Sequence, residues 1–185
     1  MDWDERVEIE NEVAAFIWID QFIQCRGDRL TSWVSTFHKD NLPCRLVNDK
    51  VSDDLRGSFN WTCKVLFADG EQWMVRFPRG GKVKNADEKV EIEVATMKII
   101  LQQTDIPIPK VQAWGLAADN KLGLGPFIIT SFIEGVSLGD ILQDPKSPNS
   151  RIMRQDVSEG DIETIYRQIA RFMLQLSKLN FFQER

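Results

Sequence analysis

The chain has 185 residues and a net charge of −5, with 43% hydrophobic and 28% charged residues. These values are typical of a water-soluble globular protein that holds one domain, or one domain and part of another. An acidic chain is a poor match to a phosphodiester backbone, so we expect no nucleic-acid partner. The longest apolar run near the N-terminus, residues 13–19, is far shorter than the ~20 residues of a membrane span, so we expect no membrane partner.

Three cysteines and a single histidine limit the chemistry of the chain. Cys25, Cys44 and Cys63 are widely spaced and form no CxxC pair, which is typical of free thiols in a reducing compartment. We therefore predict a cytoplasmic protein. Because His38 is the only histidine, there is little material for a zinc site, and we predict no metal ligands in the chain.

The first half of the chain predicts a helix and a β-hairpin. Apolar residues at helical spacing predict an amphipathic helix over residues 5–24, and a polar stretch without a predicted element follows to about residue 54. Two runs rich in β-branched and aromatic residues predict a hairpin over residues 56–78. Its turn is Ala68-Asp69-Gly70, which contains the Asp-Gly signal.

A second helix and a second hairpin follow. An apolar stripe that begins after Asn85 predicts a helix within residues 85–104, which ends before the following prolines. The stripe comprises Val90, Val94, Met97 and Leu101. Residues 110–114 and 126–132 predict two strands of a hairpin. The glycine-rich residues 123–125 precede a strand and open no helix, so we interpret them as a turn and not as a nucleotide loop.

The last part of the chain predicts helices. Ser137 can cap a short helix that ends at Leu142. Ser158, followed three residues later by Asp161, predicts the capped start of a final helix that we expect to run to the end of the chain. That helix finishes with Phe181-Phe182, which have little sequence left to cover them. This end indicates truncation and a surface available for self-association. The order of the elements predicts an α+β fold.

The second strand of the first hairpin contains a charged residue that needs a partner. Alternation places Trp73, Val75 and Phe77 on one face of the strand and Arg76 on the other. A guanidinium between apolar neighbours costs desolvation energy unless an anion meets it. Glu93, at the edge of the apolar stripe of the next helix, is its predicted partner if that helix lies across the sheet. Periodicity alone favours equally the alternative that each residue finds its own exposed counter-ion.

Four segments, in this order, resemble the family of aminoglycoside phosphotransferases and choline kinase-like enzymes, especially its fungal members. They read GSFNWTCKVLFADG, WMVRFP, EKVEIEVATMKII followed by TDIPIPKVQAWG, and GPFIITSFIEGVSLGDIL. The resemblance implies a protein-kinase-like N-terminal lobe, an antiparallel sheet with one packed helix, over residues 55–133. An N-terminal helix and extension, residues 1–54, would precede this lobe. Residues 134–185 would be the first helices of a truncated C-terminal lobe.

The resemblance also implies that the chain binds ATP. Arg76 matches the cation that holds the nucleotide phosphates, which is usually lysine in protein kinases, and Glu93 matches the helix glutamate that pairs with it. The remaining implied contacts come from a turn over the phosphates and from the backbone of the hinge that holds adenine. They are Ser58, Phe59 and Asn60 in the turn and Ser131 and Ile133 in the hinge.

The catalytic half of such an enzyme has no match in this sequence. The family uses a loop resembling HGDxxxxN and a later acidic strand for catalysis and for binding magnesium, and the only histidine here precedes the first hairpin. We therefore expect no catalytic residue in the chain, and Mg²⁺ only together with a C-terminal lobe. Three interpretations stay open: the inactive nucleotide-binding lobe of a small-molecule kinase with an unknown acceptor, a non-catalytic nucleotide-binding or protein-interaction module, and a reading frame without a function.

Overall fold

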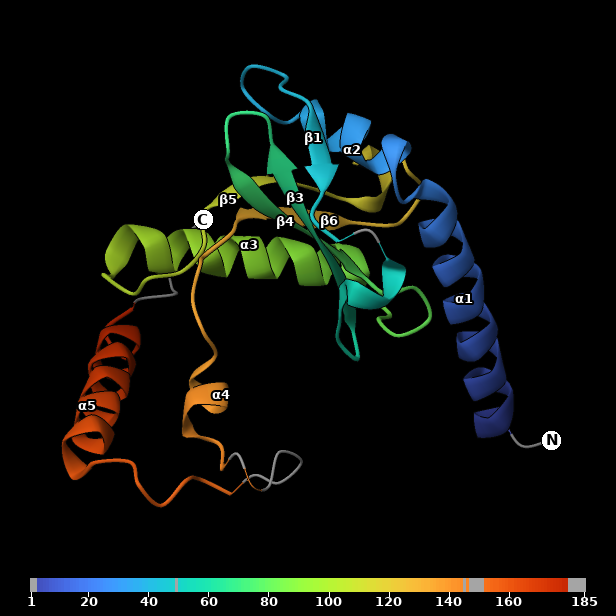
Figure 1. Cartoon of the computed structure of the whole chain (residues 1–185). Helices are drawn as coiled ribbons and strands as arrows, with labels where there is room; N and C mark the ends of the chain where they lie inside the picture. The colour runs from blue at the N-terminus through green and yellow to red at the C-terminus, as the bar shows by residue number, and fades with distance from the viewer. Residues whose placement is uncertain (1–2, 49, 145, 147–151, 180–185) are drawn as a thin grey trace. The chain divides into compact units, whose positions relative to one another are not determined.

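The chain folds as an α+β protein in which helices pack on both faces of an antiparallel sheet (Figure 1). The computed structural model describes residues 3–48, 50–144, 146 and 152–179. The elements in chain order are α1 (Trp3–Cys25), α2 (Asp28–Ser35), β1 (Cys44–Leu46), η1 (Val51–Asp53), β2 (Leu55–Arg56), β3 (Asn60–Phe67), β4 (Gln72–Pro78), α3 (Ala86–Gln103), β5 (Val111–Gly115), η2 (Ala117–Asp119), β6 (Phe127–Ser131), α4 (Leu138–Leu142) and α5 (Glu159–Leu176).

The chain divides into two units. Unit 1 comprises residues 1–98 and 109–132, and unit 2 comprises residues 99–108 and 133–185. The predicted N-terminal extension, residues 1–54, therefore belongs to the same unit as the sheet. The first unit ends at Phe132, one residue before the predicted end of the N-terminal lobe.

The sheet lies in unit 1 and has the strand order β1-β3-β4-β6-β5, with the short β2 beside β3. Every strand pair is antiparallel. Both predicted hairpins are confirmed, since β3 pairs with β4 and β5 pairs with β6. The register places Val75 of β4 opposite Cys63 of β3 and opposite Ile129 of β6, so these three residues share one face.

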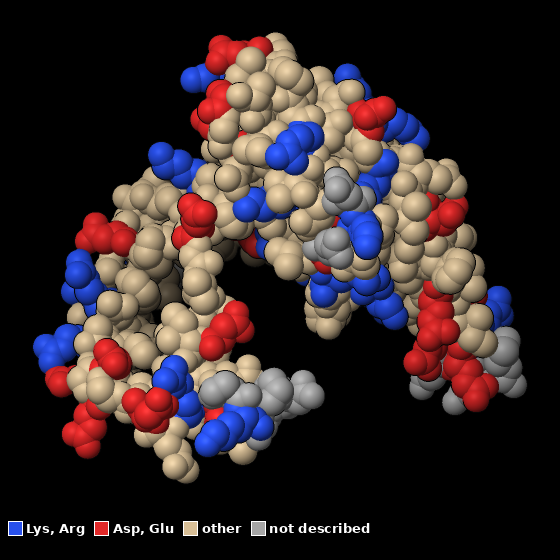
Figure 2. All heavy atoms as spheres, in the orientation of Figure 1, with Lys and Arg blue, Asp and Glu red and all other residues tan. Residues whose placement is uncertain are grey.

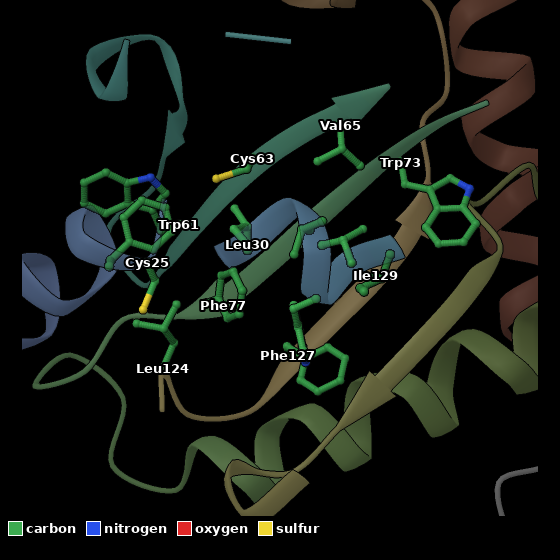
Figure 3. Packing of buried hydrophobic residues seen from close by; sticks show 14 of the residues in the cluster. Cys25, Leu30, Trp61, Cys63, Val65, Trp73, Phe77, Leu124, Phe127 and Ile129 are labelled. Carbon is green, nitrogen blue, oxygen red and sulfur yellow. The ribbon is translucent and has the colours of Figure 1, made fainter. Parts of the chain in front are cut away.

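The larger core covers the face of the sheet that carries the aromatic residues of β4. The predicted alternation is confirmed, because Trp73, Val75 and Phe77 are buried on this face. Side chains of α1, α2 and the sheet form one cluster, part of which is shown in Figure 3. The buried members of the cluster are Trp18, Phe22, Cys25, Leu30, Trp33, Val34, Trp61, Cys63, Val65, Phe67, Trp73, Val75, Phe77, Leu124, Phe127 and Ile129.

The polar stretch before residue 54 contains three elements that were not predicted: α2, β1 and the short 3-10 helix η1. Helix α2 inserts Leu30, Trp33 and Val34 into the large core, and their spacing of three and four residues is a short helical signal. Strand β1 adds an edge to the sheet beside β3. It is only three residues long and alternates weakly, so its sequence carries little strand signal.

The opposite face of the sheet packs against α3. Val90 and Val94 of α3 form a small buried cluster with Ile128 of β6, and Val111 of β5 packs against it. The predicted stripe is thus confirmed in its first half, whereas Leu101 is exposed. Arg76 lies on this face of the sheet, because it pairs with Ile128 across the β4–β6 ladder.

Two glycines let the chain pass close to α1 after β4. A Cβ atom on Gly81 would lie 2.2 Å from the carbonyl oxygen of Asn11, and its φ of 71° already favours glycine. A Cβ atom on Gly80 would lie 2.7 Å from the Trp18 ring. Gly80-Gly81 therefore fixes how closely the segment between β4 and α3 approaches the N-terminal helix.

Unit 2 contains the short α4 and the longer α5. The predicted cap of α5 is confirmed, because the Ser158 side chain accepts a hydrogen bond of 3.1 Å from the backbone N–H of Asp161. Ser137 is at the N-cap position of α4, but its side chain makes no capping bond. The prediction that the last helix runs to the end of the chain is wrong, since α5 ends at Leu176 and its last N–H groups close a tight turn. Phe181-Phe182 lies outside the described residues.

Candidate functional site

The predicted ion pair between strand β4 and helix α3 is confirmed. The Arg76 Nη2 atom donates a hydrogen bond to Oε1 of Glu93. The side chains are 28% and 33% exposed, so the pair is half-buried between the sheet and the helix. The alternative, in which each residue has its own exposed counter-ion, is wrong.

The position of the pair follows from the packing of α3. Val90 and Val94 hold the helix against the sheet, and Glu93 lies beside them on the same turn. Arg76 stands in a central strand, opposite Thr62 and Ile128. Because α3 covers this face, the arginine has a carboxylate within reach and stays partly open to solvent.

The turn between β2 and β3 is a tight hairpin. The Gly57 N–H donates to the Asn60 carbonyl over 2.9 Å, and Ser58 and Phe59 form the exposed tip. Arg79, which follows β4, holds this turn twice. Its backbone N–H donates to the Phe59 carbonyl over 2.9 Å, and its Nη1 atom donates to the Gly57 carbonyl over 3.2 Å.

A lysine connects this turn to α3. The ammonium group of Lys89 lies 5.6 Å from the centre of the Phe59 ring, and Lys89 is one helical turn before Glu93. Asn60 and Thr62 alternate with buried residues of β3 and therefore lie on the same face as Arg76. Lys89 was not among the predicted site residues, although its spacing of four residues from Glu93 would have placed it on the same side of the helix.

An open hollow lies along the same side of α3. It has a volume of about 530 Å³ and is lined by Asn85, Glu88, Lys89, Ile92 and Glu93. Its walls combine a cation, two carboxylates and one apolar side chain. The structure therefore brings Arg76, Glu93 and the turn to one side of the sheet, with a hollow beside them.

The backbone N–H of Ser131, at an expected hinge position, has a partner within the chain, and adenine binding by Ser131 and Ile133 stays a prediction. The backbone N–H of Ser131 donates to the Lys110 carbonyl over 2.9 Å, and its hydroxyl accepts from the Lys110 N–H over 3.0 Å. This N–H is thus already used within the sheet. The next N–H, of Phe132, donates to the Gln72 carbonyl over 2.8 Å. Ile133 is exposed and belongs to unit 2.

A buried ion pair outside this face was also missed. The carboxylate of Asp54 accepts bonds of 3.0 Å from Nε and from Nη2 of Arg26, and one of 3.1 Å from the Trp61 indole. Cys63 donates its thiol hydrogen to the same carboxylate over 3.6 Å. The pKa of the Cys63 thiol is raised well above its ordinary value of 9.0, first by burial and second by the nearby negative charge of Asp54. This cluster is structural and joins the end of α1 to the sheet.

Three groups with metal-binding chemistry meet at the β3–β4 turn. Nε2 of the buried His38 lies 3.4 Å from Oδ2 of Asp69 and 3.9 Å from Oε2 of Glu71. Nδ1 of His38 accepts a hydrogen bond from the Asp40 N–H, so in the neutral ring the proton is on Nε2 and faces the carboxylates. A metal ion would need the lone pair of Nε2. The hydrogen bonds thus favour a structural histidine over a metal ligand.

The described residues include no helix that is long and apolar enough to cross a lipid bilayer. The expected absence of a membrane partner and the cytoplasmic location stay predictions.

Comparison with known proteins gives one similarity. No protein-family profile matches the chain, and no solved structure matches it. Over 140 residues the chain is 27% identical to a protein of Debaryomyces hansenii named Altered inheritance of mitochondria protein 9, mitochondrial. The match covers 74% of this chain, whereas the chain spans only about a fifth (21%) of that relative's length. The chain is thus similar to part of a longer protein, and this similarity does not assign it to a family.

Proposed function

We propose that the chain carries the nucleotide-binding lobe of an ATP-dependent small-molecule kinase similar to the aminoglycoside phosphotransferases. The observation that carries the proposal is the ion pair between Arg76 and Glu93, which lie on a central strand and on the helix packed across it. In this proposal Arg76 binds the phosphates of ATP, and Glu93 orients its guanidinium.

The ion pair contributes little to the stability of the fold, which supports a role in ligand binding. Both side chains are about one-third exposed, so the pair contributes about 1 kcal/mol or less to stability. A guanidinium has five N–H donors, and the bond to Glu93 uses one of them. Its planar fork suits bidentate contact with phosphate oxygens.

The surroundings of the pair fit an anionic ligand. Lys89 adds a second cation on the same side of α3, next to the hollow. The turn at Ser58 and Phe59, which precedes β3, is exposed. Arg79 fixes the shape of this turn. Lys89, Arg79 and the turn are cations and donors, which is the chemistry that phosphates require, whereas Glu88 and Glu93 add negative charge to the walls of the hollow.

The proposal gives this chain no catalytic residue and no magnesium ligand. In a family member, magnesium would neutralise charge on the phosphates during transfer. The residues that hold it there have no match in this sequence. The proposed contribution of the chain is therefore to bind and orient the nucleotide, and the acceptor stays unassigned.

A non-catalytic module that binds nucleotide or a protein is the second candidate. It is favoured by the exposed apolar side chains of α5, which include Tyr166, Ile169 and Met173. Self-association through α5 is part of this candidate and predicts a concentration-dependent mass in analytical ultracentrifugation. The two candidates share nucleotide binding and differ in ATP consumption once a C-terminal lobe is supplied.

The test is ATP binding by variants of the clamp, measured through the broadening of the phosphorus NMR signals of ATP. Loss of a charge-assisted hydrogen bond of about 1.5–3 kcal/mol predicts about tenfold to hundredfold weaker binding by Arg76→Met. Arg76→Lys keeps the charge and should retain part of the affinity. Arg45→Met, which removes an exposed arginine from strand β1 of the same sheet, is the matched control. Equal binding by wild type and Arg76→Met would reject the proposal.

A further inference from the structure

Helix α1 is apolar on two opposite sides. One side is buried against the rest of unit 1 through Ala15, Trp18, Phe22 and Cys25. The Trp18 indole N–H also donates to the Leu124 carbonyl over 2.9 Å, so this side is fixed by a directional bond as well as by packing. The opposite side of α1 is therefore exposed even though the helix is packed against the rest of unit 1.

The opposite side carries a stripe of large apolar residues, which we name the outer face of α1, and the exposed Asp20 interrupts this stripe between Ile17 and Ile23. It consists of Ile9, Val13, Phe16, Ile17 and Ile23, all of them exposed. Their spacing of three, four and seven residues puts them on one side of a helix, over a length of about 21 Å. Single exposed apolar residues are ordinary in proteins, but a group that is uninterrupted from Ile9 to Ile17 marks an interaction surface. Phe16, near its centre, is 77% exposed.

Acidic residues border the outer face. By helical spacing, Glu5 and Glu12 fall on one border and Glu10 on the other. Over its whole length α1 has six acidic residues and a single basic one, Arg6, which pairs with Glu10 over 3.2 Å. Figure 2 shows acidic side chains gathered near the N-terminal end of this helix.

The negative charge around the outer face of α1 indicates which kind of partner this surface can bind. Two outer faces from two copies of the chain would bring like charges together, which opposes self-association. Nucleic acids and anionic membranes are repelled for the same reason. A helix with an apolar face bordered by lysine or arginine matches both the stripe and its borders.

We propose that the outer face of α1 is a docking site for a basic amphipathic helix of another protein. The apolar face of the partner packs on Val13, Phe16 and Ile17, and its cationic side chains meet Glu5 and Glu12. This site is independent of the proposed nucleotide site, because α1 packs on the face of the sheet opposite to α3.

The probe is a fluorescent peptide of leucine and lysine with about 18 residues, arranged as an amphipathic helix of five turns. Its affinity for the full chain is measured by fluorescence anisotropy at physiological salt. We expect saturable binding with one peptide per chain, and at least tenfold weaker binding by the double variant Phe16→Gln/Ile17→Gln. Ile92→Gln, which removes an exposed isoleucine from α3, is the control and should bind as wild type does. Unchanged far-UV circular dichroism shows that each variant is folded.

The charge contribution is tested separately. Glu5→Gln/Glu12→Gln should weaken binding and reduce its dependence on salt, whereas Glu91→Gln on α3 should change neither. A peptide in which glutamate replaces lysine should not bind. Three results would overturn the proposal: equal affinity of wild type and Phe16→Gln/Ile17→Gln, equal binding of the glutamate peptide, or dimers of the chain that the same α1 variant dissociates.

Discussion

The ion pair between Arg26 and Asp54 offers the sharpest test of how unit 1 is held together. The Asp54 side chain is 1% exposed and accepts two bonds from the guanidinium and one from the Trp61 indole. Asp54→Ala leaves the Arg26 charge buried without its carboxylate. Breaking a buried pair in this way costs about 3–5 kcal/mol, which is a large part of a typical unfolding free energy of about 5–15 kcal/mol.

Urea unfolding followed by tryptophan fluorescence measures this cost. With a slope of about 2 kcal/mol per molar urea, the midpoint of Asp54→Ala should fall by about 1.5–2.5 M. Glu10→Ala, which removes a carboxylate from the exposed pair with Arg6, should change the unfolding free energy by less than about 1 kcal/mol. Replacing both buried partners, as Arg26→Met/Asp54→Leu, should recover only part of the loss, because the Trp61 indole N–H is left without its acceptor. A change below about 1 kcal/mol for Asp54→Ala would show that this ion pair does not hold unit 1 together.

Three further predictions use other parts of the structure. Gly81→Ala should destabilise the chain by about 1–3 kcal/mol more than Gly123→Ala in urea unfolding. The two positions have similar φ angles of 71° and 73°, but only the new Cβ at Gly81 meets backbone, at Asn11. Equal costs for the two variants would contradict the close approach. The raised pKa of the Cys63 thiol means that the unfolded chain loses this proton near pH 9.0 while the folded chain keeps it. The unfolding free energy should therefore decrease as pH rises above about 9, and Cys63→Ala should show a smaller decrease; identical slopes would contradict the assignment. Finally, the chain with ATP and Mg²⁺ should transfer no phosphoryl group to hydroxylated acceptors. Turnover that Arg76→Ala abolishes would contradict this expectation.

Local patterns in the sequence predicted the parts of the fold that depend on neighbouring residues. Period-two alternation identified β3 and β4, and the Ser158 cap identified the start of α5. The partner of Arg76 was predicted because a buried charge requires an anion, and the next helix offered Glu93 at the right edge of its stripe.

The remaining features depend on contacts between distant segments. Asp54 accepts from Arg26, which is 28 residues away, and no local pattern in the sequence relates them. The predicted helix over residues 5–24 was read as amphipathic, whereas α1 is apolar on two sides and buries only one of them. The partner of the Ser131 N–H could not be predicted from sequence, because it depends on the pairing of Ser131 with Lys110 in a neighbouring segment.

The central claim is that Arg76, oriented by Glu93, binds nucleotide phosphate. The most direct measurement is a double-mutant cycle on the dissociation constant for ATP, with Arg76→Met, Glu93→Gln and the double variant, each shown to be folded by its urea midpoint. If Glu93 acts by orienting Arg76, both single variants should bind ATP more weakly, and the double variant should bind no more weakly than Arg76→Met alone. ATP dissociation constants that are the same for wild type and Arg76→Met, or losses that add independently, would contradict the central claim.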